Sequence, residues 1–384
     1  MEVYLDNSAT TRCSARARDL MLQVLAEDYG NPSSLHNKGK EAEDYIRRAR
    51  EQIARTLKLD GRELLFTSGG TESNNLALIG GALANQRLGR HIITTAVEHP
   101  SVHAPLAHLK GLGYEITELS VDRDGVISLE ELRCALREDT VLVSIMMVNN
   151  EIGALEPVME AGKLIKEKNP NTLFHVDAIQ AYGKFYIYPK KWGIDLLSVS
   201  GHKIHAPKGT GFLYIADKVK VQPMIFGGGQ QKGLRSGTEN VPGVAALGEA
   251  AAEIYEDFEG KIERMHALRE RLIAGIGEIE GVTVNSRTDR SCAPHIVSIS
   301  IRDVKSEVML HSLEEYGIYV SAGSACSSHK PAPSRTLQAL GLSKGAVEST
   351  IRISLSVDTT EEEVDYAAEK MKEIIPFRRK FVRR

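Results

Sequence analysis

The chain has 384 residues, of which 42% are hydrophobic and 26% charged, and its formal net charge is -3. This composition is typical of a globular protein and excludes extensive disorder. The small net charge gives no general attraction to nucleic acid or to an anionic membrane surface, so we expect neither as a partner. A small-molecule substrate fits better, and the length suits two lobes.

The four cysteines, Cys13, Cys134, Cys292 and Cys326, are scattered without CxxC spacing, which predicts neither a metal site nor a disulfide framework. The opening sequence, MEVYLDNSATTR, lacks the basic and apolar regions of an export signal, and no run of 18 apolar residues follows. We therefore expect a cytoplasmic protein with reduced thiols and no membrane segment.

Apolar strands alternate with helical segments along the first part of the chain. Apolar runs predict strands at 64–66, 91–97, 114–121, 141–148, 173–176 and 196–200, and helical spacing is found at 42–57, 72–83 and 102–109. Ser128 and Glu131 have the spacing of a capping box ahead of another helix. The pattern predicts an α/β domain with a doubly wound, mostly parallel sheet, whose ligand site lies at the carboxyl ends of the strands.

The C-terminal part has a different pattern. A long helical region at about 244–280 leads to predicted strands at 295–301 and 351–356, with helices at 307–316 and from Thr360 onward. We expect these elements to form a smaller α+β lobe, completed by the N-terminal strand. The predicted large domain is 15–258, and the predicted small domain comprises 1–14 and 259–384.

Two strand ends carry residues that suit a pyridoxal phosphate site. Asp177 ends one predicted strand in Asp-Ala-Ile-Gln, and Lys203 follows another in Ser-Gly-His-Lys. A lysine holds this cofactor as a Schiff base, and a carboxylate keeps its pyridine nitrogen protonated so that the ring accepts electrons. Taken alone, both residues also suit structural or solvated roles.

A glycine-rich turn, Ser-Gly-Gly-Thr at 68–71, strengthens this interpretation. Its glycines allow the backbone to approach an anion closely, and the helix that follows offers unpaired N–H groups and the positive end of its dipole. The turn is a candidate phosphate cradle, to which Ser200 and His202 can add hydrogen bonds. An ordinary strand-to-helix turn is the alternative.

The strings TSGGTESNN, VEHPSVH, VNNEIG, HVDAIQ, VSGHKIHAPKG, GGGQQKGLRSGTEN and SAGSACSS occur in this order over nearly the whole chain. Together they resemble the cysteine desulfurases of the NifS and IscS type, which are related to class-V aminotransferases. The resemblance implies a pyridoxal phosphate enzyme of fold type I that converts L-cysteine to L-alanine.

The resemblance also implies roles for individual residues around the cofactor and the substrate. The cofactor ring is held by Lys203 as the Schiff-base lysine, Asp177 at the pyridine nitrogen, Gln180 at the ring hydroxyl and His99 stacked on the ring. The phosphate is bound by Gly70, Thr71, Ser200, His202 and, from the neighbouring subunit of a homodimer, Thr238. The substrate is approached by Asn150 and bound through its carboxylate by Arg352, whose planar donors suit a bidentate contact.

Several of these residues have plainer alternatives in the sequence alone. His99 also suits a satisfied core histidine, Asn150 a strand end and Thr238 a turn. Arg352 lies within the apolar run 351–355 and requires an anionic partner, because an unpaired charge is costly in such surroundings.

Cys326 lies between Ser-Ala-Gly-Ser-Ala and Ser-Ser-His-Lys-Pro. These small and polar neighbours favour a reactive, exposed thiol over a buried structural one. The resemblance implies that the Cys326 thiolate takes sulfur from L-cysteine as a persulfide and passes it to acceptor proteins, including those of iron-sulfur cluster assembly. Lys203 and His99 would carry the protons.

Related activities stay open at this point. Selenocysteine lyases, cysteine sulfinate desulfinases and small-amino-acid aminotransferases share the cofactor residues, but an aminotransferase has no use for Cys326. A non-enzymatic sulfur-carrier subunit is disfavoured by the presence of Lys203, Asp177, His99 and Cys326.

Overall fold

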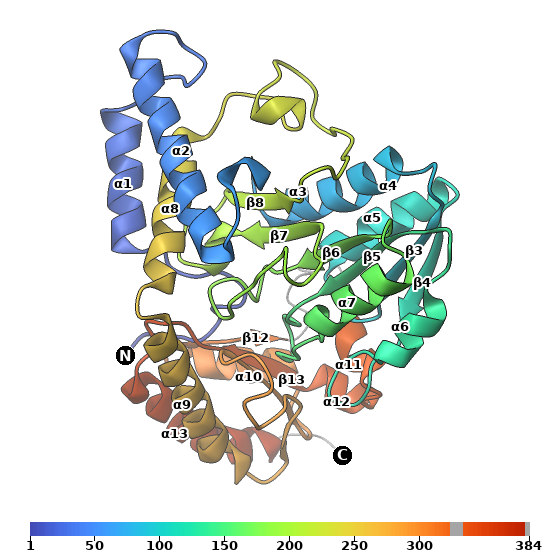
Figure 1. Cartoon of the computed structure of the whole chain (residues 1–384). Coiled ribbons are helices and arrows are strands. Elements are labelled where there is room, and N and C mark those ends of the chain that lie inside the picture. The colour runs from blue at the N-terminus through green and yellow to red at the C-terminus, as the bar shows by residue number, and fades with distance from the viewer. Residues whose placement is uncertain (323–332, 381–384) are drawn as a thin grey trace.

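The computed structural model describes residues 1–322 and 333–380. The chain forms a large sheet with helices on both faces, and a smaller antiparallel sheet formed mainly by the C-terminal part (Figure 1). Across the described residues, none of the helices combines the length and the apolar character needed to cross a bilayer.

The large sheet has seven strands in the order β2-β8-β7-β6-β5-β3-β4. The strands are β2 Leu64–Thr67, β3 His91–Thr95, β4 Glu115–Leu119, β5 Thr140–Met146, β6 Leu173–Asp177, β7 Leu196–Ser200 and β8 Gly211–Ile215. Within this sheet β8 is antiparallel to both of its neighbours, and the remaining pairs are parallel. The predicted mostly parallel α/β sheet is therefore confirmed.

Helices cover both faces of this sheet. One face packs against α1 Ala15–Ala26, α2 Asn37–Leu57, α6 Leu129–Ala135, α7 Val158–Lys168 and α8 Val241–Tyr255. The other face packs against α3 Gly70–Asn75, the π-helical turn Leu76–Gly80, α4 Gly81–Ala84 and α5 Pro100–Gly111. In β2, Leu64 and Phe66 join the first core and Leu65 joins the second. Because both faces are buried, such strands carry apolar residues in succession instead of at every second position.

The second sheet has four antiparallel strands in the order β12-β13-β10-β9. They are β9 Val282–Val284, β10 Ile296–Ile301, β12 Ser321–Ala322 and β13 Thr350–Ser354. The helices of this part are α9 Phe258–Gly277, α10 Ser306–Glu314, α11 Arg335–Ala339, α12 Lys344–Glu348 and α13 Glu361–Arg379. β1 Val3–Tyr4 pairs with β11 Ile318–Tyr319, and Val3 and Leu5 join the hydrophobic core of this part. The bounds of the two domains stay a prediction.

Two local predictions were wrong in detail. The helical region at 244–280 is two helices, α8 and α9, because Asp257 between them has a left-handed backbone with φ 44°. The capping box ahead of α6 is half formed. The Ser128 hydroxyl accepts the N–H of Glu131, but the Glu131 carboxylate accepts from Ser120 instead of returning to Ser128.

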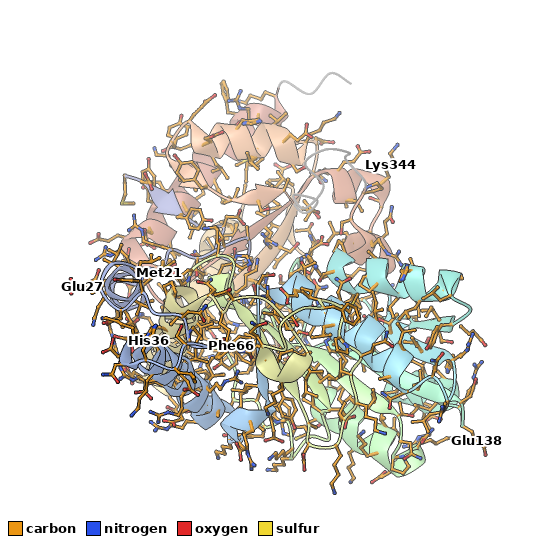
Figure 2. The ribbon with its side chains drawn as sticks, turned by 90° about the horizontal axis from the view of Figure 1, so that it is seen from above. Met21, Glu27, His36, Phe66, Glu138 and Lys344 are labelled. Atoms are coloured by element: carbon orange, nitrogen blue, oxygen red, sulfur yellow. The ribbon has the colours of Figure 1, made fainter. Side chains whose placement is uncertain are left out.

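The segment 6–11, which we call the N-terminal strap, links the two sheets. Asp6 forms a β-bridge with Ser354 at the end of β13, and the Thr11 N–H donates to the His202 carbonyl oxygen after β7. Seen from above, Met21 of α1 lies on one side of the molecule, far from Glu138 ahead of β5 (Figure 2). Through its contacts with Ser354 and His202, the strap connects β13 of the small sheet to the end of β7 in the large sheet.

Candidate active site

A cavity of about 490 Å³ lies where the carboxyl ends of β5, β6 and β7 meet the N-terminal strap and β13. Its wall contains most of the residues predicted from the sequence, namely Gly70, Thr71, His99, Asn150, Asp177, Gln180, Ser200, His202, Lys203 and Arg352. Thr238 is exposed and does not line this cavity within its own chain, and its role across a subunit interface stays a prediction. Cys326 lies outside the described residues.

Asp177 is the last residue of β6 and is held by hydrogen bonds on both of its carboxylate oxygens. Oδ1 accepts the Ile179 N–H at 3.0 Å, and Oδ2 accepts Nδ2 of Asn74 at 2.8 Å. The same Asn74 nitrogen donates to the Ser101 hydroxyl at 2.9 Å, and that hydroxyl lies 2.8 Å from His99 Nδ1. A buried network thus connects Asp177 to His99.

A second buried carboxyl, that of Glu98, lines the same cavity. Burial raises the pKa of Asp177, whereas its hydrogen bonds from the Ile179 N–H and Asn74, and then the charge of Lys203, favour its charged form. Burial, and then the Asp177 charge, raise the pKa of Glu98 well above its ordinary value. Within the described residues Oε2 of Glu98 has no hydrogen-bond partner. The proton of this pair therefore belongs on Glu98, and Asp177 carries the charge.

His99 caps the N-terminus of α5, a helix that begins with Pro100 at its first position. Its Nδ1 accepts the Ser101 N–H at 3.1 Å. Burial lowers the pKa of His99, so the ring is neutral at pH 7.

Lys203 ends the 3-10 turn η3 Gly201–Lys203 that follows β7. Its Nζ donates to the carbonyl oxygens of Ser8 at 2.5 Å and Ala9 at 2.7 Å, both in the N-terminal strap. Gln180 Nε2 donates to the same Ser8 oxygen at 3.0 Å. Behind the turn, Lys184 Nζ donates to the Lys203 carbonyl oxygen at 2.6 Å, and burial followed by the Lys203 charge lowers the pKa of Lys184 to about 7.

The predicted phosphate cradle lies at the start of α3. Gly69 has φ 147°, a conformation that favours glycine, and a Cβ on Gly70 would lie 2.1 Å from Cδ1 of Ile179. Ser200 and His202 line the cavity beside these glycines. Burial and the charges of nearby lysines lower the pKa of His202 to about 4, which leaves a neutral ring.

This donor set fits pyridoxal phosphate. It combines a lysine, a buried carboxylate held in its charged form, and a cradle at a helix N-terminus whose glycines add no side chains of their own. Within residues 1–322 and 333–380, no group of three or more His, Cys, Asp or Glu side chains is arranged to hold a metal ion.

Arg352 enters the cavity from β13 and is 7% exposed. Its Nη2 donates to Oδ1 of Asp6 at 2.8 Å, and its Nη1 donates to the Asn150 carbonyl oxygen at 2.8 Å. The anionic partner that the sequence required for Arg352 is therefore Asp6.

Several residues of the cavity wall were not predicted from the sequence, including Glu98 and His103, and neither was Asp6 beside it. His103 lies one turn after His99 on α5, and burial lowers its pKa to about 4. The four-residue spacing of the two histidines could have placed them on one helix face. Asp6 offered no local signal, because its partner is 346 residues away.

Comparisons with known proteins agree with this geometry. The aminotransferase class-V family model matches residues 3–367. The cysteine desulfurase IscS of Methanosarcina thermophila is 42% identical over 373 residues, which cover 97% of this chain and 92% of that protein. A solved structure of a NifS-like protein has a TM-score of 0.93 and 39% identity over 98% of this chain and 100% of that chain. A structure of SspA in complex with cysteine has a TM-score of 0.81 and 32% identity, and the match covers 93% of this chain and 100% of that chain.

Proposed function

Because the chain belongs to the class-V aminotransferase family, we propose that it is a cysteine desulfurase that uses pyridoxal phosphate to convert L-cysteine to L-alanine. The observation that carries the proposal is one cavity shared by Lys203, Asp177 and Arg352. An amino-acid substrate needs both an arginine for its carboxylate and a cofactor that reacts with its amine. Similarity to a protein solved with cysteine supports this substrate.

The residues around the cavity would hold the cofactor in the following way. The ring would be held by Lys203 through a covalent bond, Asp177 at the pyridine nitrogen, Gln180 at the ring hydroxyl and His99 against the ring face. The phosphate would be bound by Gly70, Thr71, Ser200, His202 and, across a homodimer interface, Thr238. When bound, pyridoxal phosphate supplies a ring that accepts the electrons left when the substrate loses its α-proton.

The substrate would be oriented by Arg352, which binds the carboxylate through two neighbouring N–H groups. Asn150 lies beside Arg352 and would contact the same substrate. Once the substrate amine has displaced Lys203 from the cofactor, the free Lys203 amine would take the α-proton, and the carbonyl oxygens of Ser8 and Ala9 would keep this amine close to the cavity. Neutral His99 would assist the proton transfer.

Cys326 would then accept the sulfur. Its thiolate attacks the sulfur of L-cysteine, an S–S bond forms as the C–S bond breaks, and the carbon that loses sulfur gains a proton. The balance is L-cysteine plus a thiol giving L-alanine plus a persulfide. We further propose that acceptor proteins, including those of iron-sulfur cluster assembly, receive this sulfur, and that the protein works in the cytoplasm, where thiols stay reduced.

The experiment that tests this function measures alanine and sulfide together during turnover of L-cysteine with excess thiol reductant. We expect equal amounts of the two products from the wild type and no turnover from Lys203→Ala. Keto-acid formation without sulfide would indicate transamination instead. Turnover of selenocysteine but not of cysteine would indicate a selenocysteine lyase.

A further inference from the structure

The ion pair between Asp6 and Arg352 joins the N-terminal strap to β13 at the edge of the cavity. The pair has an Nη2–Oδ1 distance of 2.8 Å, and its side chains are 20% and 9% exposed, respectively. We propose that Asp6 is a positioning residue that orients the Arg352 guanidinium for the α-carboxylate of the amino-acid substrate. The proposal rests on the proposed function, because it takes Arg352 as the group that binds this carboxylate.

The hydrogen bonds of Arg352 define which donors face the substrate. A guanidinium has five N–H donors in one plane. Asp6 accepts one from Nη2, and the Asn150 carbonyl oxygen accepts one from Nη1. Among the described residues, the Nε–H is buried and has no partner. Two contacts fix the plane of the guanidinium, and each terminal nitrogen keeps one further N–H with which to meet a carboxylate as a fork.

Asp6 itself is held by the backbone around it. It forms a β-bridge with Ser354, which lies two residues after Arg352 on the same strand. The Asn7 side-chain amide donates to the Ser354 carbonyl oxygen at 3.0 Å, and the Ser8 N–H donates to the Ser354 hydroxyl at 2.8 Å. The carboxylate of Asp6 is therefore presented by a segment fixed to the strand that carries Arg352.

Among the titratable groups near Arg352, Asp6 is the one whose negative charge pairs with the guanidinium. Glu151 also lines the cavity, but burial raises its pKa, and its Oε2 accepts the Ser334 hydroxyl at 2.6 Å. His295 nearby is buried and neutral, because burial and then the charge of Lys184 lower its pKa well below the ordinary value. Asp6 thus balances the Arg352 charge when the cavity holds no substrate, and it shares that charge with the substrate carboxylate afterwards.

Two substitutions separate orientation from charge. Asp6→Ala removes both, and we expect the KM for L-cysteine to rise about tenfold or more while kcat stays within about twofold. The reason is that losing an interaction made equally in the ground state and the transition state raises KM alone. Asp6→Asn keeps an oxygen that accepts the Arg352 N–H but removes the negative charge. We expect its KM to equal or fall below the wild-type value, so the conservative variant rescues the defect.

Ligands with and without a carboxylate make the test specific. Binding of L-alanine and of cysteamine to the cofactor-loaded enzyme is followed through the absorbance of the cofactor. Asp6→Ala should weaken L-alanine about tenfold and leave cysteamine unchanged. Glu2→Ala, which shortens an exposed acidic side chain near the same segment, should change neither ligand.

The outcomes distinguish this proposal from the proposed function. If Arg352→Gln weakens L-alanine but Asp6→Ala does not, or if Asp6→Ala weakens both ligands equally, the positioning role of Asp6 is refuted. If Arg352→Gln binds L-alanine as the wild type does, the carboxylate role of Arg352 in the proposed function is refuted. Asp6→Asn keeps the size of the side chain and decides the matter if Asp6→Ala does not fold, because a raised KM in Asp6→Asn contradicts the proposal.

Discussion

Replacement of Asn74 by alanine tests how the buried network maintains the charge of Asp177. Asn74 is fully buried, and its Nδ2 donates to Asp177 Oδ2 at 2.8 Å. A hydrogen bond to a charged group contributes about 1.5–3 kcal/mol. Its loss therefore raises the pKa of Asp177 further, and at about 1.4 kcal/mol per factor of ten this free energy corresponds to about a 10- to 100-fold change. The charged form is then lost at a higher pH than in the wild type.

We expect the value of kcat/KM for L-cysteine in Asn74→Ala to fall about 10- to 100-fold, by the same conversion of free energy. The assay is alanine formation measured across pH, in which the acidic limb of the profile should move upward. Asn75→Ala is a matched control, because the Asn75 amide donates to the Thr71 carbonyl oxygen within the helix and does not contact Asp177. Unchanged kcat/KM and an unchanged acidic limb in Asn74→Ala would refute the reasoning, as would an equal loss in Asn75→Ala.

Two further predictions concern the cradle and the core. Gly69→Ala places a side chain on a backbone with φ 147°, which costs about 1–3 kcal/mol of backbone strain. We expect it to weaken binding of the cofactor about tenfold or more in equilibrium titrations. Gly229→Ala, which lies away from the cavity, should not weaken this binding. Burial lowers the pKa of His175, which lies between Ser144 and Ser198, to about 3. The unfolded state therefore binds the proton first, and the contribution of His175 to stability is present above about pH 6.5 and is lost as the pH falls toward 3. At pH 5 the loss is about 2 kcal/mol. The free energy of unfolding, measured with denaturant, should therefore fall between pH 7 and pH 5 by about 2 kcal/mol less in His175→Gln than in the wild type. An equal fall in both proteins would contradict the assignment.

The strands of the large sheet were predictable because burial on both faces leaves an apolar run that local sequence records. β5 and β6 are buried at every position, and their ends place Asp177 and Asn150 at one edge. The short antiparallel strand β8 was not predicted. Its pairing with β2 and β7 is decided by the sheet as a whole. The break before α9 was also missed, because Asp257 is neither glycine nor proline.

The residues of the site likewise fall into a group that the local sequence predicts and a group that it does not. Lys203 and the glycine cradle carry recognisable chemistry in consecutive residues, so the sequence was sufficient to propose them. Asn74 and Asp6 act through partners 103 and 346 residues away, and no local pattern distinguishes either from an ordinary polar residue. The contribution of the N-terminal strap, which binds the Lys203 amine through two carbonyl oxygens, depends on backbone groups that every sequence contains.

The central claim is that sulfur leaves L-cysteine as a persulfide on Cys326. The most direct test is a single turnover without reductant, in which alanine is measured and the modified peptide is identified by mass spectrometry. Cys134→Ala serves as the control, because Cys134 is an exposed cysteine that does not line the cavity. We expect the wild type and Cys134→Ala to form alanine with an equal amount of persulfide on Cys326. We expect Cys326→Ala to keep the yellow cofactor and to lose turnover, and release of sulfur by Cys326→Ala at the wild-type rate would contradict the claim.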